Sequence, residues 1–117
     1  MTPLEAAWRS VVERWPIGFR EFEQALSGWE IHPVFVDGNA VGAILVNGPE
    51  IHACIAGGYG RWFRKEQVAI LNAVIERHGY AQTHATTPAG ERFVARLGFQ
   101  KVGNAFRRYT KWESKQS

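Results

Sequence analysis

The chain has 117 residues, which is enough for a single domain. Its hydrophobic fraction of 45% supports a packed core and excludes global disorder. The net charge of +3 and the isoelectric point of about 9.4 favour anionic partners such as phosphates, but they exclude neither an enzyme nor a binding protein.

The first quarter of the chain predicts two amphipathic helices. Thr2 at the N-cap, Pro3 at the first helical position and Glu5 two residues later form a capping box. Apolar residues then recur at helical spacing as far as Trp15, and Pro16 is expected to end this helix. The apolar face of the second helix is formed by Phe19, Phe22, Leu26 and Trp29.

Three strands joined by tight turns follow these helices. The segments EIHPVFV (30–36), AVGAILV (40–46) and EIHACIA (50–56) are rich in β-branched residues. The Asp-Gly pair in residues 37–40 supplies the positive φ angles of a hairpin turn. Asn47-Gly48-Pro49 makes the second connection, so the three strands predict an antiparallel meander.

The second half of the chain predicts a helix, a strand, a helix and a final hairpin. Apolar residues from Val68 to Ile75 mark the first of these helices, which ends at His78 and Gly79. A short strand follows in residues 80–86, and Pro88 starts a helix that Gly98 ends. The segments FQKVG and AFRRYTKW form the last two strands, and Gly103-Asn104 separates them.

The predicted order of elements is therefore α-α-β-β-β-α-β-α-β-β. We expect one α/β domain of the α+β type over residues 1–117, with helices flanking a mixed and mostly antiparallel sheet. Residues 113–117 form a polar tail.

The segment RFVARLGFQKVG (92–103) resembles the Y-x-x-L-G-F-x-x-x-G signature of the GCN5-related N-acetyltransferases. The order of elements also matches that superfamily, without its first strand, and the resemblance covers roughly residues 8–112. It implies that acetyl-coenzyme A binds in a gap between the family's fourth and fifth strands and that the acetyl group passes to an amine. The family's fourth strand corresponds to residues 50–56.

The resemblance assigns the cofactor to this strand and to the loop after it. The strand backbone would pair with the pantetheine arm, and the loop 58–65 with the next helix N-terminus would hold the pyrophosphate. Counting back from Gly79 places Trp62 and Arg64 at the family's glycine positions, so two interpretations stay open. Either the backbone of Gly58-Tyr59-Gly60 forms a nest that binds the pyrophosphate, or the positively charged side chains of the loop bind it instead. The residues assigned to the cofactor are Cys54, Ile55, Ala56, Gly58, Gly60, Arg61, Trp62, Arg64, Lys65, Thr87 and Arg96.

Catalysis by direct attack of an amine needs a base for the amine proton and an acid for the leaving thiolate. Val94 stands where the family has its tyrosine acid, and Thr87 stands where it often has an asparagine. Glu50 or His52 is the candidate base, with His84 on the following strand. Alternation places the first two side chains on one strand face with Cys54. A histidine with a purely structural or surface role remains the alternative for His52.

Metal binding and membrane insertion are not expected. The four histidines lack an H-x-x-x-H spacing, and the single cysteine excludes an internal disulfide. No apolar stretch reaches the roughly 20 residues of a membrane span, and the N-terminus is typical of a helix start rather than of a signal peptide. We therefore expect a cytoplasmic protein, and the resemblance implies that it acts on a small-molecule or protein amine.

Two other functions compete with acetyl transfer. The missing tyrosine and displaced glycines favour a catalytically degenerate module, and the Gly-Arg-Trp wording is similar to that of acetyltransferase-like proteins of tailed phages, some of them virion components. A nucleic-acid binder is ranked last, because acidic residues balance most of the charge, although segments 61–65 and 106–112 mix cations with aromatics. Five tryptophans also leave room for a homodimer interface.

Overall fold

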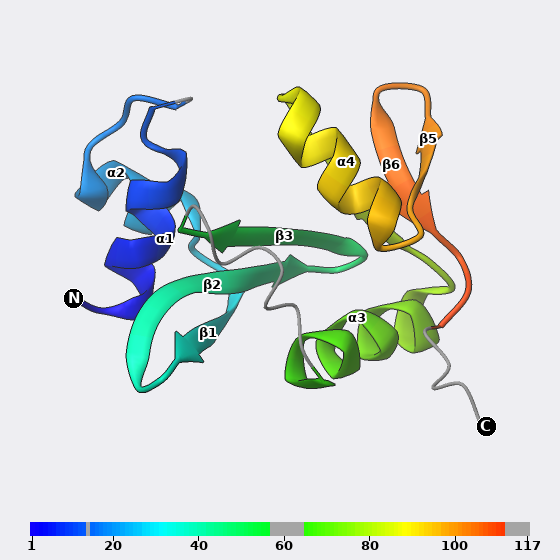
Figure 1. The fold of residues 1–117 in the computed structure, drawn as a ribbon, viewed down its shortest axis with the longest axis horizontal. Coiled ribbons are helices and arrows are strands. Elements are labelled where there is room, and N and C mark those ends of the chain that lie inside the picture. Colours follow the sequence, from blue (N-terminus) through cyan, green and yellow to red (C-terminus); the bar gives the residue numbers. More distant parts are fainter. Residues whose placement is uncertain (14, 57–64, 112–117) are drawn as a thin grey trace. The chain divides into compact units, whose positions relative to one another are not determined.

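The computed structural model describes residues 1–13, 15–56 and 65–111. Within them it contains four helices and a six-stranded sheet of strand order β1-β2-β3-β4-β6-β5 (Figure 1). This confirms the predicted fold class and order of elements. The elements are α1 (Pro3–Val11), α2 (Phe19–Ala25), β1 (Glu30–Val36), β2 (Asn39–Asn47), β3 (Glu50–Ile55), α3 (Lys65–His78), β4 (Ala81–Thr83), α4 (Pro88–Arg96), β5 (Gln100–Val102) and β6 (Ala105–Arg108).

The chain divides into two compact units, and β3 contributes to both. The described part of the first unit is residues 1–13, 15–47 and 52–56, and that of the second is residues 48–51 and 65–111. The expectation of one domain over the whole chain stays a prediction.

In the first unit, α1 packs on β1 and β2 and contacts α2. Apolar side chains from these elements and from β3 exclude water from its core, which supplies the main driving force for folding. Leu4, Trp8, Val11, Ile17 and Trp29 border this core. The buried core residues are Ala7, Phe22, Leu26, Ala43, Leu45 and Cys54.

Helix α1 begins as predicted and ends earlier than predicted. Thr2 and Glu5 form both hydrogen bonds of the capping box, and Pro3 is the first helical residue. The helix stops at Val11, so the expectation that it continues to Trp15 is wrong. Pro16 has no N–H to continue the hydrogen-bond ladder, and it disfavours the helical conformation of the residue before it. Trp15 lies beyond the helix and is 47% exposed.

We expect Thr2→Ala to lower the free energy of unfolding by about 1 kcal/mol, because an alanine N-cap cannot accept a hydrogen bond from the helix start. In the structure the Thr2 hydroxyl accepts from the Glu5 N–H at 3.1 Å. Urea denaturation followed by tryptophan fluorescence measures the change. Thr2→Ser keeps the acceptor and should remain within a few tenths of a kcal/mol of the wild type; an equal loss in both variants would contradict the capping role.

Strands β1 and β2 form the predicted antiparallel hairpin, with positive φ at Asp37 (52°) and Gly38 (79°) in its turn. The register shifts once, because Val34 lies opposite Gly42 whereas the next residue of β1 lies opposite Ala40. The shift leaves Val41 without a direct partner on β1, as in a β-bulge. Residues 41–46 of β2 are all buried, so both faces of this strand are covered.

In the second unit, Glu50 of β3 lies opposite Gln82 of β4 in the parallel sense, and β4, β6 and β5 pair antiparallel. Glycine ends both helices with positive φ, at Gly79 and Gly98, as predicted. Four predicted strands are shorter in the structure. Residues 50–56 contract to Glu50–Ile55, residues 80–86 to Ala81–Thr83 and residues 99–103 to Gln100–Val102, and the last strand ends at Arg108. Figure 1 shows α4 beside the hairpin formed by β5 and β6.

Candidate functional site

The backbone of β3 alternates between its two neighbouring strands. The Ala56 N–H donates to the Val41 carbonyl of β2 at 2.8 Å, whereas the Pro49 carbonyl accepts from the Gln82 N–H of β4 at 2.8 Å. Successive residues of a strand turn their backbone groups to opposite sides. Ile55 therefore directs its N–H and carbonyl to the same edge as Pro49, away from β2.

The three residues that were predicted to pair with the pantetheine arm direct their backbone groups to different edges of β3. Cys54 and Ala56 direct their backbone toward β2, and the Ala56 N–H is already donated there. Among the three, Ile55 alone presents backbone to the other edge. Ala53 shares that edge and was not predicted, although the two-residue period of the strand links it to Ile55. The assignment of these residues to a cofactor stays a prediction. The backbone groups that face away from β2, and so could pair with the cofactor, are those of Ala53 and Ile55.

A close approach between β2 and β3 fixes this backbone arrangement. Gly42 is buried, and a Cβ atom at its position would collide with the Cys54 carbonyl oxygen and would lie 2.8 Å from the Ile55 Cα. Real Cβ atoms essentially never lie within 3.0 Å of backbone atoms. Glycine at this position therefore lets β3 lie against β2 with Ile55 in its observed place.

The candidate bases Glu50 and His52 fall in different units. The half-buried His52 ring lies 5.6 Å from the Trp29 ring, which packs against the core that contains Cys54. His52 and Cys54 thus share one face of β3, as alternation predicts. Glu50 is half-buried in the second unit, where it lies opposite Gln82. Histidine is the side chain that most often acts as a general base, so the ring of His52 has the chemistry that the role requires.

Most of the predicted pyrophosphate loop lies outside the described residues. This applies to Gly58, Gly60, Arg61, Trp62 and Arg64, so both interpretations of the loop stay open. Lys65 is described, and it is the exposed first residue of α3. A cation at this end opposes the helix dipole, which favours an anion, and Glu66 in the first turn supplies one negative charge.

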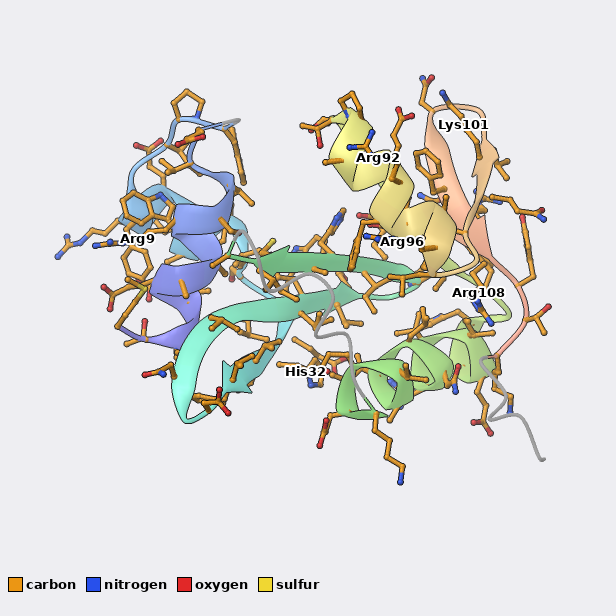
Figure 2. All side chains as sticks on the ribbon, viewed as in Figure 1. Arg9, His32, Arg92, Arg96, Lys101 and Arg108 are labelled. Atoms are coloured by element: carbon orange, nitrogen blue, oxygen red, sulfur yellow. The ribbon has the colours of Figure 1, made fainter. Side chains whose placement is uncertain are left out.

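The predicted residues of α4 have clear local roles. Thr87 is the N-cap, and its hydroxyl accepts from the Gly90 N–H at 3.0 Å. Val94, at the position where the resemblance would place a tyrosine acid, is 7% exposed and therefore buried. Arg96 is exposed in the last turn, where a cation complements the helix dipole (Figure 2). His84 is exposed, with Nδ1 3.3 Å from the Asn104 carbonyl oxygen.

The glycine of the Leu-Gly-Phe motif has a packing role that the sequence did not reveal. Arg108 donates from Nη1 to the Leu97 carbonyl and from Nε to the Thr110 carbonyl, each at 2.6 Å. A Cβ at Gly98 would collide with that Nη1. Burial lowers the pKa of Arg108, which nevertheless keeps its charge at neutral pH. Because Arg108 is distant in sequence, no local pattern predicts this contact.

Among the described residues, no group of three or more acidic, histidine or cysteine side chains gathers as a metal site. Within the same residues, none of the helices is both long and apolar enough to cross a membrane. Comparison with protein-family models, with curated proteins and with solved structures finds no match for this chain. The proposal of a function therefore rests on the residues and on the fold.

Proposed function

We propose that this chain is an acyl-CoA-dependent N-acetyltransferase that resembles the GCN5-related superfamily and acts on a small-molecule or protein amine. The observation that carries the proposal is the order of elements, because the α-α-β-β-β-α-β-α-β-β order of the structure is the one the resemblance implies. The Leu97-Gly98-Phe99 motif adds to it, since it lies at the end of α4 where the family has its signature.

The backbone edge of β3 supports the choice of cofactor. A pantetheine arm carries amide groups, and Ala53 and Ile55 present backbone N–H and carbonyl groups that pair with amides as a neighbouring strand does. Lys65 and Arg96 are exposed cations suited to phosphates, together with the predicted loop residues 58–64. When bound, acetyl-coenzyme A supplies an acetyl group activated as a thioester.

His52 is the better candidate for the base, because its half-buried ring is held against Trp29. It would take the proton of the attacking amine directly or through a water molecule. Val94 has no proton to donate, so the leaving thiolate would be protonated by solvent. A thiol has a pKa near 8.5, so its thiolate leaves with less help from an acid than an alkoxide would need.

We expect thiol release from acetyl-CoA in the presence of a panel of primary amines, and we expect His52→Gln to lower kcat by about 100-fold, the lower end of the effect of a general base. A thiol-reactive dye measures the release. The matched control is His78→Gln, an exposed histidine at the end of α3, which should leave the rate within about twofold.

A non-catalytic module of the same fold is the second candidate, and the burial of Val94 favours it. A family member without its tyrosine acid can keep the fold and the cofactor edge while losing turnover. Such a module would serve as an accessory or virion component, as the phage-like Gly-Arg-Trp wording suggests. Cofactor binding without thiol release from any amine would favour this module, whereas measurable release would exclude it.

A further inference from the structure

Charge is unevenly distributed along the chain. Residues 1–56 carry three Lys or Arg and seven Asp or Glu, so their net charge is −4. Residues 57–117 carry eleven Lys or Arg and four Asp or Glu, so their net charge is +7. Within residues 81–111 the imbalance is six cations against one acid, Glu91. The part of the second unit formed by β4, α4, β5 and β6 is therefore strongly basic, and such a surface attracts a polyanion.

The three-stranded part of this unit has one covered and one open face. Thr83 and Phe106 lie opposite each other and are buried, and Arg108 on their face reaches the Leu97 carbonyl at the end of α4. Gln82, Arg107 and Gln100 lie opposite one another in a row across β4, β6 and β5, and they point to the other face. Gln100 is exposed and the other two are half-exposed, so this second face remains open to solvent.

Two tyrosines extend this row into an aromatic platform. The Tyr80 and Tyr109 rings lie 6.0 Å apart, and Tyr109 is 54% exposed. The Arg107 guanidinium lies 4.8 Å from the centre of the Tyr80 ring, and its Nε donates to Gln82 Oε1 at 2.7 Å. A weaker hydrogen bond from Nη1 to the Tyr109 hydroxyl raises the pKa of Arg107. Lys111 lies at the margin, paired with Glu76 at 3.9 Å.

We propose that the open face of β4, β6 and β5, defined by Tyr80, Gln82, Gln100, Arg107 and Tyr109, binds single-stranded nucleic acid. Flat rings and a guanidinium plane stack on unpaired bases, whereas bases inside a duplex hide these faces. The glutamine amides offer donors and acceptors to base edges. The basic surroundings attract the phosphates. An acidic peptide would match the charge but would leave the aromatic rings without stacking partners.

The test is fluorescence anisotropy of a labelled oligothymidylate of about 15 nucleotides, which spans the usual single-strand site. The full chain should bind it with an affinity that falls as salt rises. Tyr109→Ala should weaken binding about 5- to 150-fold, the range for loss of one stacking contact, and Tyr109→Phe should keep it. Arg107→Gln should weaken binding more than Arg92→Gln, which removes the same charge from an exposed position on α4 (Figure 2).

Three results would overturn the proposal. The first is no binding at about 100 µM protein in low salt, where nonspecific association is already measurable. The second is an equal loss of affinity in Arg107→Gln and Arg92→Gln, which would reduce the effect of Arg107 to net charge. The third is equal competition by polyglutamate or by duplex DNA, which would assign the surface to acidic proteins or to unspecific polyanions. Acetyl-CoA binding is measured separately, so its outcome does not decide this one.

Discussion

Replacing Gly42 with alanine is expected to lower the free energy of unfolding by about 3 kcal/mol, the upper end of the usual cost of overpacking. The added Cβ meets the Cys54 carbonyl oxygen and the Ile55 Cα, which are backbone atoms and cannot rotate away as a flexible side chain would. The strand β2 is buried on both faces at this point, so it has little room to shift. Either β3 moves away from β2 or the Ala56–Val41 hydrogen bond is lost.

Gly18→Ala is the matched control for this change. Gly18 has an ordinary φ of −69°, and a Cβ there would lie 3.6 Å from its nearest neighbour, Glu21 Oε1, at normal contact distance. Its exposed N-cap position should limit the loss to less than about 1 kcal/mol. Urea denaturation of both variants measures the difference. Equal stability of the two variants would contradict the close approach of β2 and β3.

Ala53→Pro is expected to weaken acetyl-CoA binding at least tenfold while leaving the fold largely intact. Proline removes one N–H and fixes φ near −65°, which extended backbone accepts at the edge of a strand. The Ala53 N–H points away from β2, where the pantetheine arm is proposed to pair, and the Ala53 side chain is exposed. A tenfold loss corresponds to about 1.4 kcal/mol, as expected for one lost hydrogen bond with a ligand.

Ala56→Pro makes the same chemical change on the opposite side of β3. It removes the N–H that the Val41 carbonyl accepts, and an unsatisfied buried carbonyl costs about 1–3 kcal/mol. We therefore expect Ala56→Pro to lower the thermal midpoint more than Ala53→Pro does. Calorimetric titration of both variants with acetyl-CoA, together with thermal unfolding, separates the two effects. Equal destabilisation of both variants would contradict the alternation assigned to β3.

Local sequence signals predicted the parts of the fold that depend on neighbours in the chain. The capping box at Thr2, the Asp37-Gly38 turn and the glycine stops at Gly79 and Gly98 all act within a few residues, and the structure contains each of them. The end of α1 was mispredicted because the apolar residues continue at helical spacing up to Pro16. Proline disfavours helical structure already in the residues before it. The apolar pattern alone does not reveal where the hydrogen-bond ladder stops.

The candidate site was less predictable, because its geometry depends on which strand lies on which side of β3. The sequence alone shows that Ala53 and Ile55 turn their backbone groups to the same edge of β3. Which edge this is becomes clear only from the hydrogen bonds of β3 with Val41 on one side and Gln82 on the other. The contact between Gly98 and Arg108 likewise depends on the pairing of β6 with its neighbours. Such pairings join residues far apart in the chain, where composition and spacing give no signal.

The platform of Tyr80, Arg107 and Tyr109 shows how the structure adds to a sequence pattern. The mixture of cations and aromatics in residues 106–112 predicts only a general affinity for nucleic acid. The antiparallel register places Arg107 opposite Gln82 and brings Tyr109 beside Tyr80, which comes from a different segment. Charge balance over the whole chain had weighed against this partner, because the acids lie mainly in residues 1–56.

Isothermal titration of the full chain with acetyl-CoA tests the proposed function most directly. We expect saturable binding of one cofactor per chain with a Kd below 1 mM, equivalent to more than about 4 kcal/mol of binding free energy. Desulfo-CoA should compete, because it keeps the pantetheine and phosphate groups that the β3 backbone and the predicted cations are proposed to hold. Absence of binding at millimolar cofactor, by a chain whose folding is verified by circular dichroism, would contradict the assignment as an acetyltransferase.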